Sequence, residues 1–198
     1  MVVEHDLNLF QLGFKAAAVA LERLHHGIII VIDARNTKEF SHDFTNGLLF
    51  NNTSLLTAFT VHYQPRNDLA ILRVPGLGTE PLALDPDPRS GTAAAIAGFP
   101  GGGPFTLEAA RLGTTGKVMS QDSYGRGPIE RRMTSFRGKV RQGNSGGPVI
   151  DGDGEVLTTV FASALGEGPS QGLGVPNSVT RKALGRLGQE RVDTGPCA

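Results

Sequence analysis

The stretch RQGNSGGPVID, residues 141–151, decides the fold prediction, because it sets one serine between Gly-Asn and Gly-Gly-Pro directly before an apolar segment. Loops are often rich in Gly, Asn and Ser, so the plainest interpretation is a hairpin loop. The more specific interpretation makes Ser145 a nucleophile on a tight turn, where the backbone N–H groups of Gly143, Asn144 and Ser145 are candidates for holding an oxyanion. A serine needs a base to remove its proton and a third group to orient that base. This interpretation therefore requires a histidine and an acid elsewhere in the chain.

The composition favours an all-β protein that acts on neither nucleic acid nor polyanions. The chain has 198 residues, enough for one large domain, with 27 Gly and 12 Pro spread between short apolar runs. Its 19 basic and 19 acidic residues cancel, which gives no basic surface for nucleic acid. The longest apolar runs fall well short of the roughly 18 residues of a membrane span, and the N-terminus lacks the basic region of a signal peptide.

Two groups of strands are predicted, with a helix on each side. Apolar residues at helical spacing predict a helix over residues 8–25. Short apolar runs between turn residues predict a first group of strands in about 27–85 and a second in about 90–180. A last helix is predicted over residues 178–190, with Asn177 or Ser178 as its N-cap.

Two segments resemble the chymotrypsin-like (trypsin-like) serine proteases. GNSGGPVIDGDGEVLTTVFA, residues 143–162, resembles their active-serine segment, and PRNDLAILRVPGL, residues 65–77, resembles their aspartate segment, with Asp68 before a short buried strand. From Tyr63 to the C-terminus the chain is most similar to actinobacterial membrane-anchored, acid-resistance serine proteases of the MarP type. The first sixty residues fit this family less well.

The resemblance implies a fold, an activity and a location. The implied fold is all-β, with two six-stranded antiparallel β-barrels in a single protease domain covering 1–198, an N-terminal helix and a short C-terminal helix. The implied activity is a serine endopeptidase that cleaves peptide or protein substrates without a metal or cofactor. The family works outside the cytoplasm, in the periplasm or cell envelope, so that location is expected by resemblance alone.

The base is the least certain member of the predicted triad. Of the five histidines, His42 ends the segment GIIIVIDARNTKEFSH, residues 27–42, whose strand, turn and histidine follow the layout of the family's histidine segment. The order His42, Asp68, Ser145 is the one this family uses. The second glycine of the family's first strand is replaced by isoleucine, and Phe40-Ser41 stands where the family has Thr-Ala. A rival alignment of LLTAFTV puts Thr60 in the place of the base, which would make the chain an inactive protease. His62 is only six residues before Asp68 and is expected to be a half-exposed strand residue.

The resemblance also assigns substrate contacts. Lys139 falls at the base of the specificity pocket, where it would disfavour cleavage after Lys or Arg, although an exposed loop lysine fits the sequence as well. Phe161, Ala162 and Ser163 fall on the strand that pairs with the substrate backbone.

Two further hypotheses stay open. The chain is either a working protease or an inactive homologue that binds peptides or partner proteins, and its N-terminal region is either intact or truncated. Cys197 is the only cysteine, so it cannot form an internal disulfide and is expected to be a free thiol.

Overall fold

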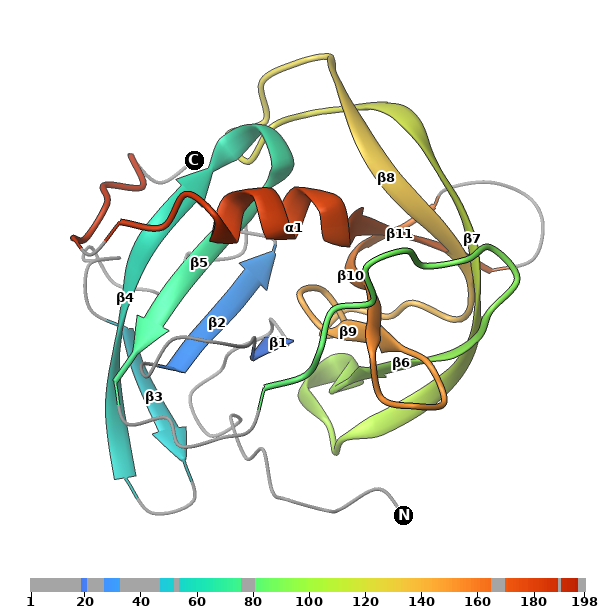
Figure 1. The fold of residues 1–198 in the computed structure, drawn as a ribbon, viewed down its shortest axis with the longest axis horizontal. Coiled ribbons are helices and arrows are strands. Elements are labelled where there is room, and N and C mark those ends of the chain that lie inside the picture. Colours follow the sequence, from blue (N-terminus) through green and yellow to red (C-terminus); the bar gives the residue numbers. More distant parts are fainter. Residues whose placement is uncertain are drawn as a thin grey trace.

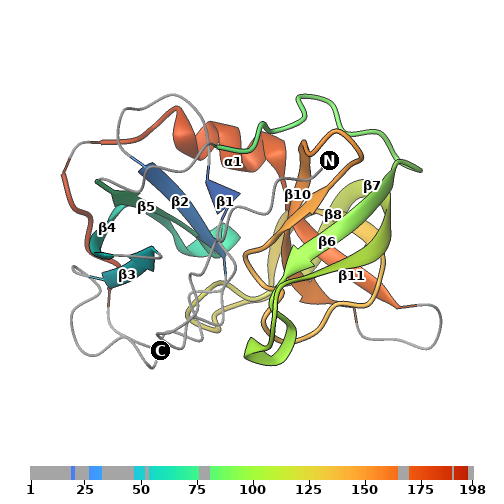
Figure 2. The ribbon, with the colours of Figure 1, turned by 90° about the horizontal axis from the view of Figure 1, so that it is seen from below.

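The computed structural model describes the backbone of residues 19–20, 27–32, 47–51, 54–75, 81–164, 170–188 and 190–195, and nearly all side chains from residue 58 onward within these ranges. The described residues form a five-stranded sheet followed by a closed six-stranded barrel (Figure 1). Seen from below, the sheet and the barrel lie side by side (Figure 2).

The sheet is antiparallel with the strand order β1-β2-β5-β4-β3. Its strands are β1 (Val19–Ala20), β2 (Gly27–Ile32), β3 (Gly47–Asn51), β4 (Ser54–Gln64) and β5 (Leu69–Val74). The short 3-10 helix η2 (Pro65–Asn67) joins β4 to β5. This connection ends at Asp68, so the fold fixes the predicted acid at one end of the sheet.

The barrel has the strand order β10-β11-β8-β7-β6-β9. Its strands are β6 (Ala93–Gly98), β7 (Thr106–Ser120), β8 (Ile129–Arg137), β9 (Pro148–Ile150), β10 (Val156–Ser163) and β11 (Gln171–Pro176). The 3-10 helix η3 (Pro100–Gly102) follows β6. The strand β9 pairs with both β6 and β10, and this pairing closes the barrel. The segment that carries Ser145, the predicted nucleophile, therefore directly precedes the closing strand of the barrel.

One hydrophobic cluster joins the sheet to the barrel. It is made of buried residues from β4 and β5, from three barrel strands and from the C-terminal helix: Val61, Leu69, Ile71, Met133, Val156, Phe161, Val175 and Ala183. A second cluster, of Ile96, Phe136, Val149 and Val160, fills the barrel interior. Removing apolar side chains from water is favourable. The shared cluster therefore stabilises the contact between the sheet and the barrel.

The helix α1 (Asn177–Leu184) lies across the junction of sheet and barrel (Figure 1). Its first residue, Asn177, is buried and donates hydrogen bonds from its amide to the carbonyl oxygens of Asp85 (2.9 Å) and Val156 (2.6 Å). The segment before β6 also bonds to β10, through Asp85 N–H to Val156 O and Val156 N–H to Ala83 O. Asn177 thus ties the helix to the connection between the two units.

The predicted fold class is confirmed, with four differences. The C-terminal helix predicted over 178–190 is shorter, because α1 ends at Leu184. The first unit is a five-stranded sheet in the described residues, where a six-stranded barrel was predicted. The helix predicted over 8–25 is wrong at Val19–Ala20, which form β1 because they pair with β2, and the rest of that range lies outside the described residues. The predicted N-cap is also wrong: Pro176 is the N-cap, and Asn177 uses its side chain for the two carbonyls. In the described part of the chain, no helix is long and apolar enough to cross a membrane.

The substitution Asn177→Ala should lower the free energy of unfolding by about 1–3 kcal/mol, because it removes both hydrogen bonds donated by this buried side chain. Urea unfolding measures the change. Ser178→Ala is the matched control, since its neighbouring side chain is exposed and should change the free energy by less than about 0.5 kcal/mol. Equal effects of the two substitutions would contradict the role of Asn177.

Candidate active site

The segment around the predicted nucleophile Ser145, residues 141–147, consists of two successive turns and is called the nucleophile turn below. Asn144 N–H donates to Arg141 O, and Gly147 N–H donates to Asn144 O, each at 3.0 Å. The third residue of each turn is a glycine with positive φ, Gly143 at 94° and Gly146 at 81°. This is the arrangement of a type II turn, in which the third position favours glycine. The backbone of the two turns therefore favours glycine at positions 143 and 146, whatever the chemistry of the segment.

The turns are fixed to the barrel through β10. Gly146 N–H donates to Val160 O, and Val160 N–H donates to Gly147 O, both at 2.8 Å. The side chain of Asn144 is buried, and its Oδ1 accepts the N–H of Arg141 at 2.9 Å. Ser145 is held between these anchored residues, so its position is set by the barrel.

Two backbone donors of this segment are left for a ligand. The N–H groups of Asn144, Gly146 and Gly147 are all used in the bonds above. Within the described ranges, no backbone acceptor takes the N–H of Gly143 or of Ser145. Ser145 is half-buried. Of the three predicted oxyanion donors, the geometry leaves Gly143 and Ser145 available and commits the N–H of Asn144 to the turn.

Asp68 sits at the junction of η2 and β5, with its side chain 1% exposed. Its φ of 54° is in the left-handed region, which Asp tolerates better than most residues. The Asp68 N–H donates to Pro65 O at 3.1 Å, and Ser123 N–H from the β7–β8 connection donates to the same oxygen at 3.0 Å. A tight turn buttressed by the barrel therefore presents this carboxylate.

A buried arginine connects the Asp68 turn to β10. Arg131 is 4% exposed, donates to Arg66 O at 3.4 Å, and places its guanidinium 4.3 Å from the ring centroid of Phe161. Phe161 follows Val160, the residue that bonds to Gly146 and Gly147. These contacts link the acid-bearing end of the sheet to the strand beside Ser145.

Tyr63 supports the same junction. Its hydroxyl shares a 2.6 Å hydrogen bond with Ser123 Oγ. Burial raises the pKa of Tyr63 to about 12, although the bond to Ser123 acts in the opposite direction. The hydroxyl is therefore protonated at neutral pH, where it holds the β7–β8 connection against β4.

The predicted base lies outside the described residues, whereas Thr60 of the rival alignment and the strand residue His62 lie on β4. His42 falls in the range 33–46, which the structure does not describe. Thr60 is buried and pairs with Leu72, and His62 is half-buried and pairs with Ile71. Asp68 directly precedes Leu69, so these pairings put Thr60 and His62 about 13 Å and 10 Å from it along the strands. Neither position lies beside the Asp68 carboxylate.

The residues predicted to contact substrate lie on the barrel. Phe161 is buried, Ala162 is half-buried and Ser163 is exposed at the end of β10. On one side, Ala162 and Ser163 pair with β11, and in the described residues no strand pairs with their other edge. Lys139 is exposed, while its neighbour Val140 packs against the barrel cluster. The exposure of Lys139 agrees with the alternative of a surface loop lysine.

The glycine-rich segment after β6, residues 101–103, has no role that follows from the sequence alone. In the structure, Gly101 donates its N–H to Gln142 O at 2.7 Å, directly beside the nucleophile turn. The signal that could have found it is the run of three glycines after a strand, since glycine marks close approach of backbones.

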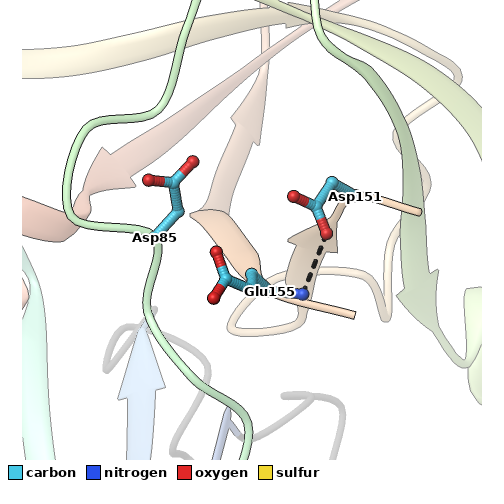
Figure 3. A group of neighbouring side chains, drawn as sticks. All are labelled: Asp85, Asp151 and Glu155. Carbon is cyan, nitrogen blue, oxygen red and sulfur yellow. Dashed lines mark hydrogen bonds between the residues drawn. The ribbon is translucent and has the colours of Figure 1, made fainter. Parts of the chain in front are cut away.

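A group of three carboxylates lies at the far end of β9 from Ser145. Oxygen atoms of Asp85, Asp151 and Glu155 lie within 4.8 Å of one another, and Figure 3 shows the side chains facing a common space. Asp151 Oδ1 accepts the N–H groups of Asp153 and Glu155, and Asp85 Oδ1 accepts that of Asp87. Two of the three carboxylates thus stabilise local turns, as Asp commonly does.

The chain is similar in sequence to known proteins. The family model described as a trypsin-like peptidase domain matches residues 30–157. The serine protease Rv3671c of Mycobacterium tuberculosis is 36% identical over 143 residues, which is 71% of this chain and 36% of that protein. The chain therefore spans about a third of the length of this relative.

Solved structures show the same fold. The active form of the Rv3671c protease has a TM-score of 0.69 and 34% identity, covering 77% of this chain and 68% of that one. The HtrA-type protease AlgW, solved with a tripeptide, has a TM-score of 0.67 at 18% identity, covering 86% of this chain and 54% of that one. The second similarity supports the fold alone.

His62 should make the fold sensitive to acid. Burial, and secondarily the charge of Arg186, lowers the pKa of His62 below its ordinary 6.5. The unfolded chain then binds more protons than the folded chain as the pH falls below about 6.5, so the free energy of unfolding decreases there. His62→Gln should reduce this acid-side loss, measured by urea unfolding at about pH 7.5 and about pH 5.5. Equal losses in the two proteins would contradict the assignment.

Proposed function

Because the chain belongs to the trypsin-like peptidase family, we propose that it is a serine endopeptidase with Ser145 as nucleophile and Asp68 and His42 as its triad partners. The observation that carries the proposal is the nucleophile turn, where the N–H groups of Gly143 and Ser145 have no backbone acceptor among the described residues. Two such donors can bind a developing oxyanion, whereas a purely structural hairpin loop does not need them.

The reaction follows from these roles. Ser145 Oγ attacks the carbonyl carbon of the scissile peptide while His42 takes the hydroxyl proton. The carbonyl oxygen becomes an oxyanion that accepts hydrogen bonds from Gly143 and Ser145 N–H. His42 then protonates the leaving amine, the C–N bond breaks, and an acyl-enzyme remains. Water, deprotonated by His42, attacks the ester and releases the acid product.

Asp68 is proposed to orient the base. A buried carboxylate is stable only when donors meet it, and an imidazole Nδ1–H is a suitable donor. Its negative charge would stabilise the imidazolium that forms during the reaction. Position 60 lies about 13 Å along the strands from Asp68, so the proposal places the base at His42 instead of in the rival alignment.

The substrate is proposed to bind as an added strand. Within the described ranges, no strand pairs with the outer edge of β10 at Ala162 and Ser163, and this edge runs on from Val160, which anchors the nucleophile turn. Phe161 lies between Val160 and this edge. Backbone pairing of this kind tolerates many sequences, so the substrate class is an extended peptide or protein segment. Lys139 would disfavour Lys or Arg before the scissile bond if it lines the pocket.

The cellular location is proposed from the family alone. The resembled proteases work outside the cytoplasm, and we propose the same periplasmic or cell-envelope location here. The described chain spans about a third of the curated relative, so the anchoring and partners of the whole protein belong to this proposal too.

A fluorophosphonate probe tests the triad, because it reacts only with an activated serine. Labelling should disappear in Ser145→Ala and His42→Ala, and should slow on the order of 10⁴-fold in Asp68→Asn. His62→Ala is the matched control for His42→Ala and should label like the wild type, because His62 lies away from Asp68 on β4.

Two outcomes would overturn the proposal. Persistent labelling in Ser145→Ala would place the nucleophile elsewhere. A wild type that shows a folded β spectrum by circular dichroism but stays unlabelled would favour the peptide-binding, inactive homologue.

A further inference from the structure

The end of β6 and the loop after it, residues 98–101, contact the nucleophile turn at three places. Gly101 N–H donates to Gln142 O at 2.7 Å. A side chain at Gly143 would overlap the carbonyl oxygen of Phe99, and a Cβ at Gly98 would lie 2.6 Å from Asn144 Nδ2. Residues 98–101 thus lie directly against residues 142–144, although they are about forty residues apart in the sequence.

The bond from Gly101 fixes the direction of one peptide unit. In a trans peptide, the C=O and N–H groups point to opposite sides of the chain. Holding Gln142 O toward Gly101 therefore turns Gly143 N–H away from the loop, where it stays without an acceptor among the described residues. The positive φ of Gly143, 94°, is the value that this peptide orientation requires.

The alternative orientation would remove the donor. A four-residue turn can exchange type II for type I by rotating its central peptide, with little movement of the flanking residues. Rotation of the 142–143 peptide would replace Gly143 N–H by Gln142 O, and an oxygen there would repel an oxyanion. The bond from Gly101 is the contact in the structure that opposes this rotation.

We propose that Gly101 is a positioning residue, which holds the peptide between Gln142 and Gly143 so that Gly143 N–H can bind the oxyanion. This inference rests on the proposed protease function. The loop is itself held in shape, since Gly103 N–H donates to Pro100 O at 3.2 Å, and the rings of Phe99 and Phe105 pack edge to face at 5.4 Å. Gly101 has a φ of 68°, which only a few residue types accept.

A substitution series at position 101 tests the proposal through this φ. A Cβ at Gly101 meets no atom within 4 Å, so a side chain acts there by backbone strain alone. Asn tolerates the left-handed region, Ala does so less well, and a β-branched Val is an outlier there. The rate of fluorophosphonate labelling and kcat should fall in the order Gly101, Gly101→Asn, Gly101→Ala, Gly101→Val. The loss for Val should be at least about tenfold, and below the roughly 10³-fold that deletion of an oxyanion donor causes.

Gly91 provides a matched control series. It lies at the other end of β6, has a φ of 91° and also has open space around its Cβ position. Gly91→Asn, Gly91→Ala and Gly91→Val should show the same ranking in melting temperature but wild-type labelling and kcat. At position 101, KM for a peptide substrate should change by less than about threefold, because the donor acts mainly in the transition state.

The outcomes separate the two proposals. If the wild type is labelled at Ser145 but labelling and kcat are flat across the 101 series, or fall equally in the 91 series, Gly101 has no positioning role and the protease function stands. If the wild type is unlabelled, the protease function fails and this inference fails with it. If Gly101→Val does not fold, the ranking of Asn and Ala still decides.

Discussion

The strand β9 is the constraint on which the candidate site depends. It has only three residues, Pro148–Ile150, yet it pairs with β6 on one side and β10 on the other and so closes the barrel. The chain must therefore reach β9 between its two neighbouring strands, β6 and β10. The nucleophile turn therefore lies between the loop after β6 and the last residues of β10, and bonds to both.

This placement explains why glycine recurs around Ser145. Gly143 and Gly146 adopt positive φ because two tight turns follow each other within seven residues. Gly98 and Gly143 also leave no space for a side chain, since backbones from two sides meet there. A turn shaped from both sides keeps its N–H groups fixed before any substrate arrives, which is what electrostatic preorganisation requires.

Local patterns were predictable from the sequence, and long-range contacts were not. The nucleophile turn and the placement of Asp68 before β5 follow from short motifs whose backbone needs are local. The docking of Gly101 on Gln142 and the use of Asn177 on two distant carbonyls depend on barrel closure, which no short segment encodes. Val19–Ala20 show the same limit, since pairing with β2 overrides a helix-favouring composition.

Two members of the proposed triad, Asp68 and Ser145, come from different units. The junction between the sheet and the barrel therefore sets the distance between them. Asp68 belongs to the sheet, whereas Ser145 belongs to the barrel. Their relative position is set by the shared cluster that contains Leu69 and Phe161, and by Arg131, which contacts both sides. Because a displacement of about 1 Å can cost two orders of magnitude in rate, the proposed activity requires the packing at this junction as well as the reacting groups.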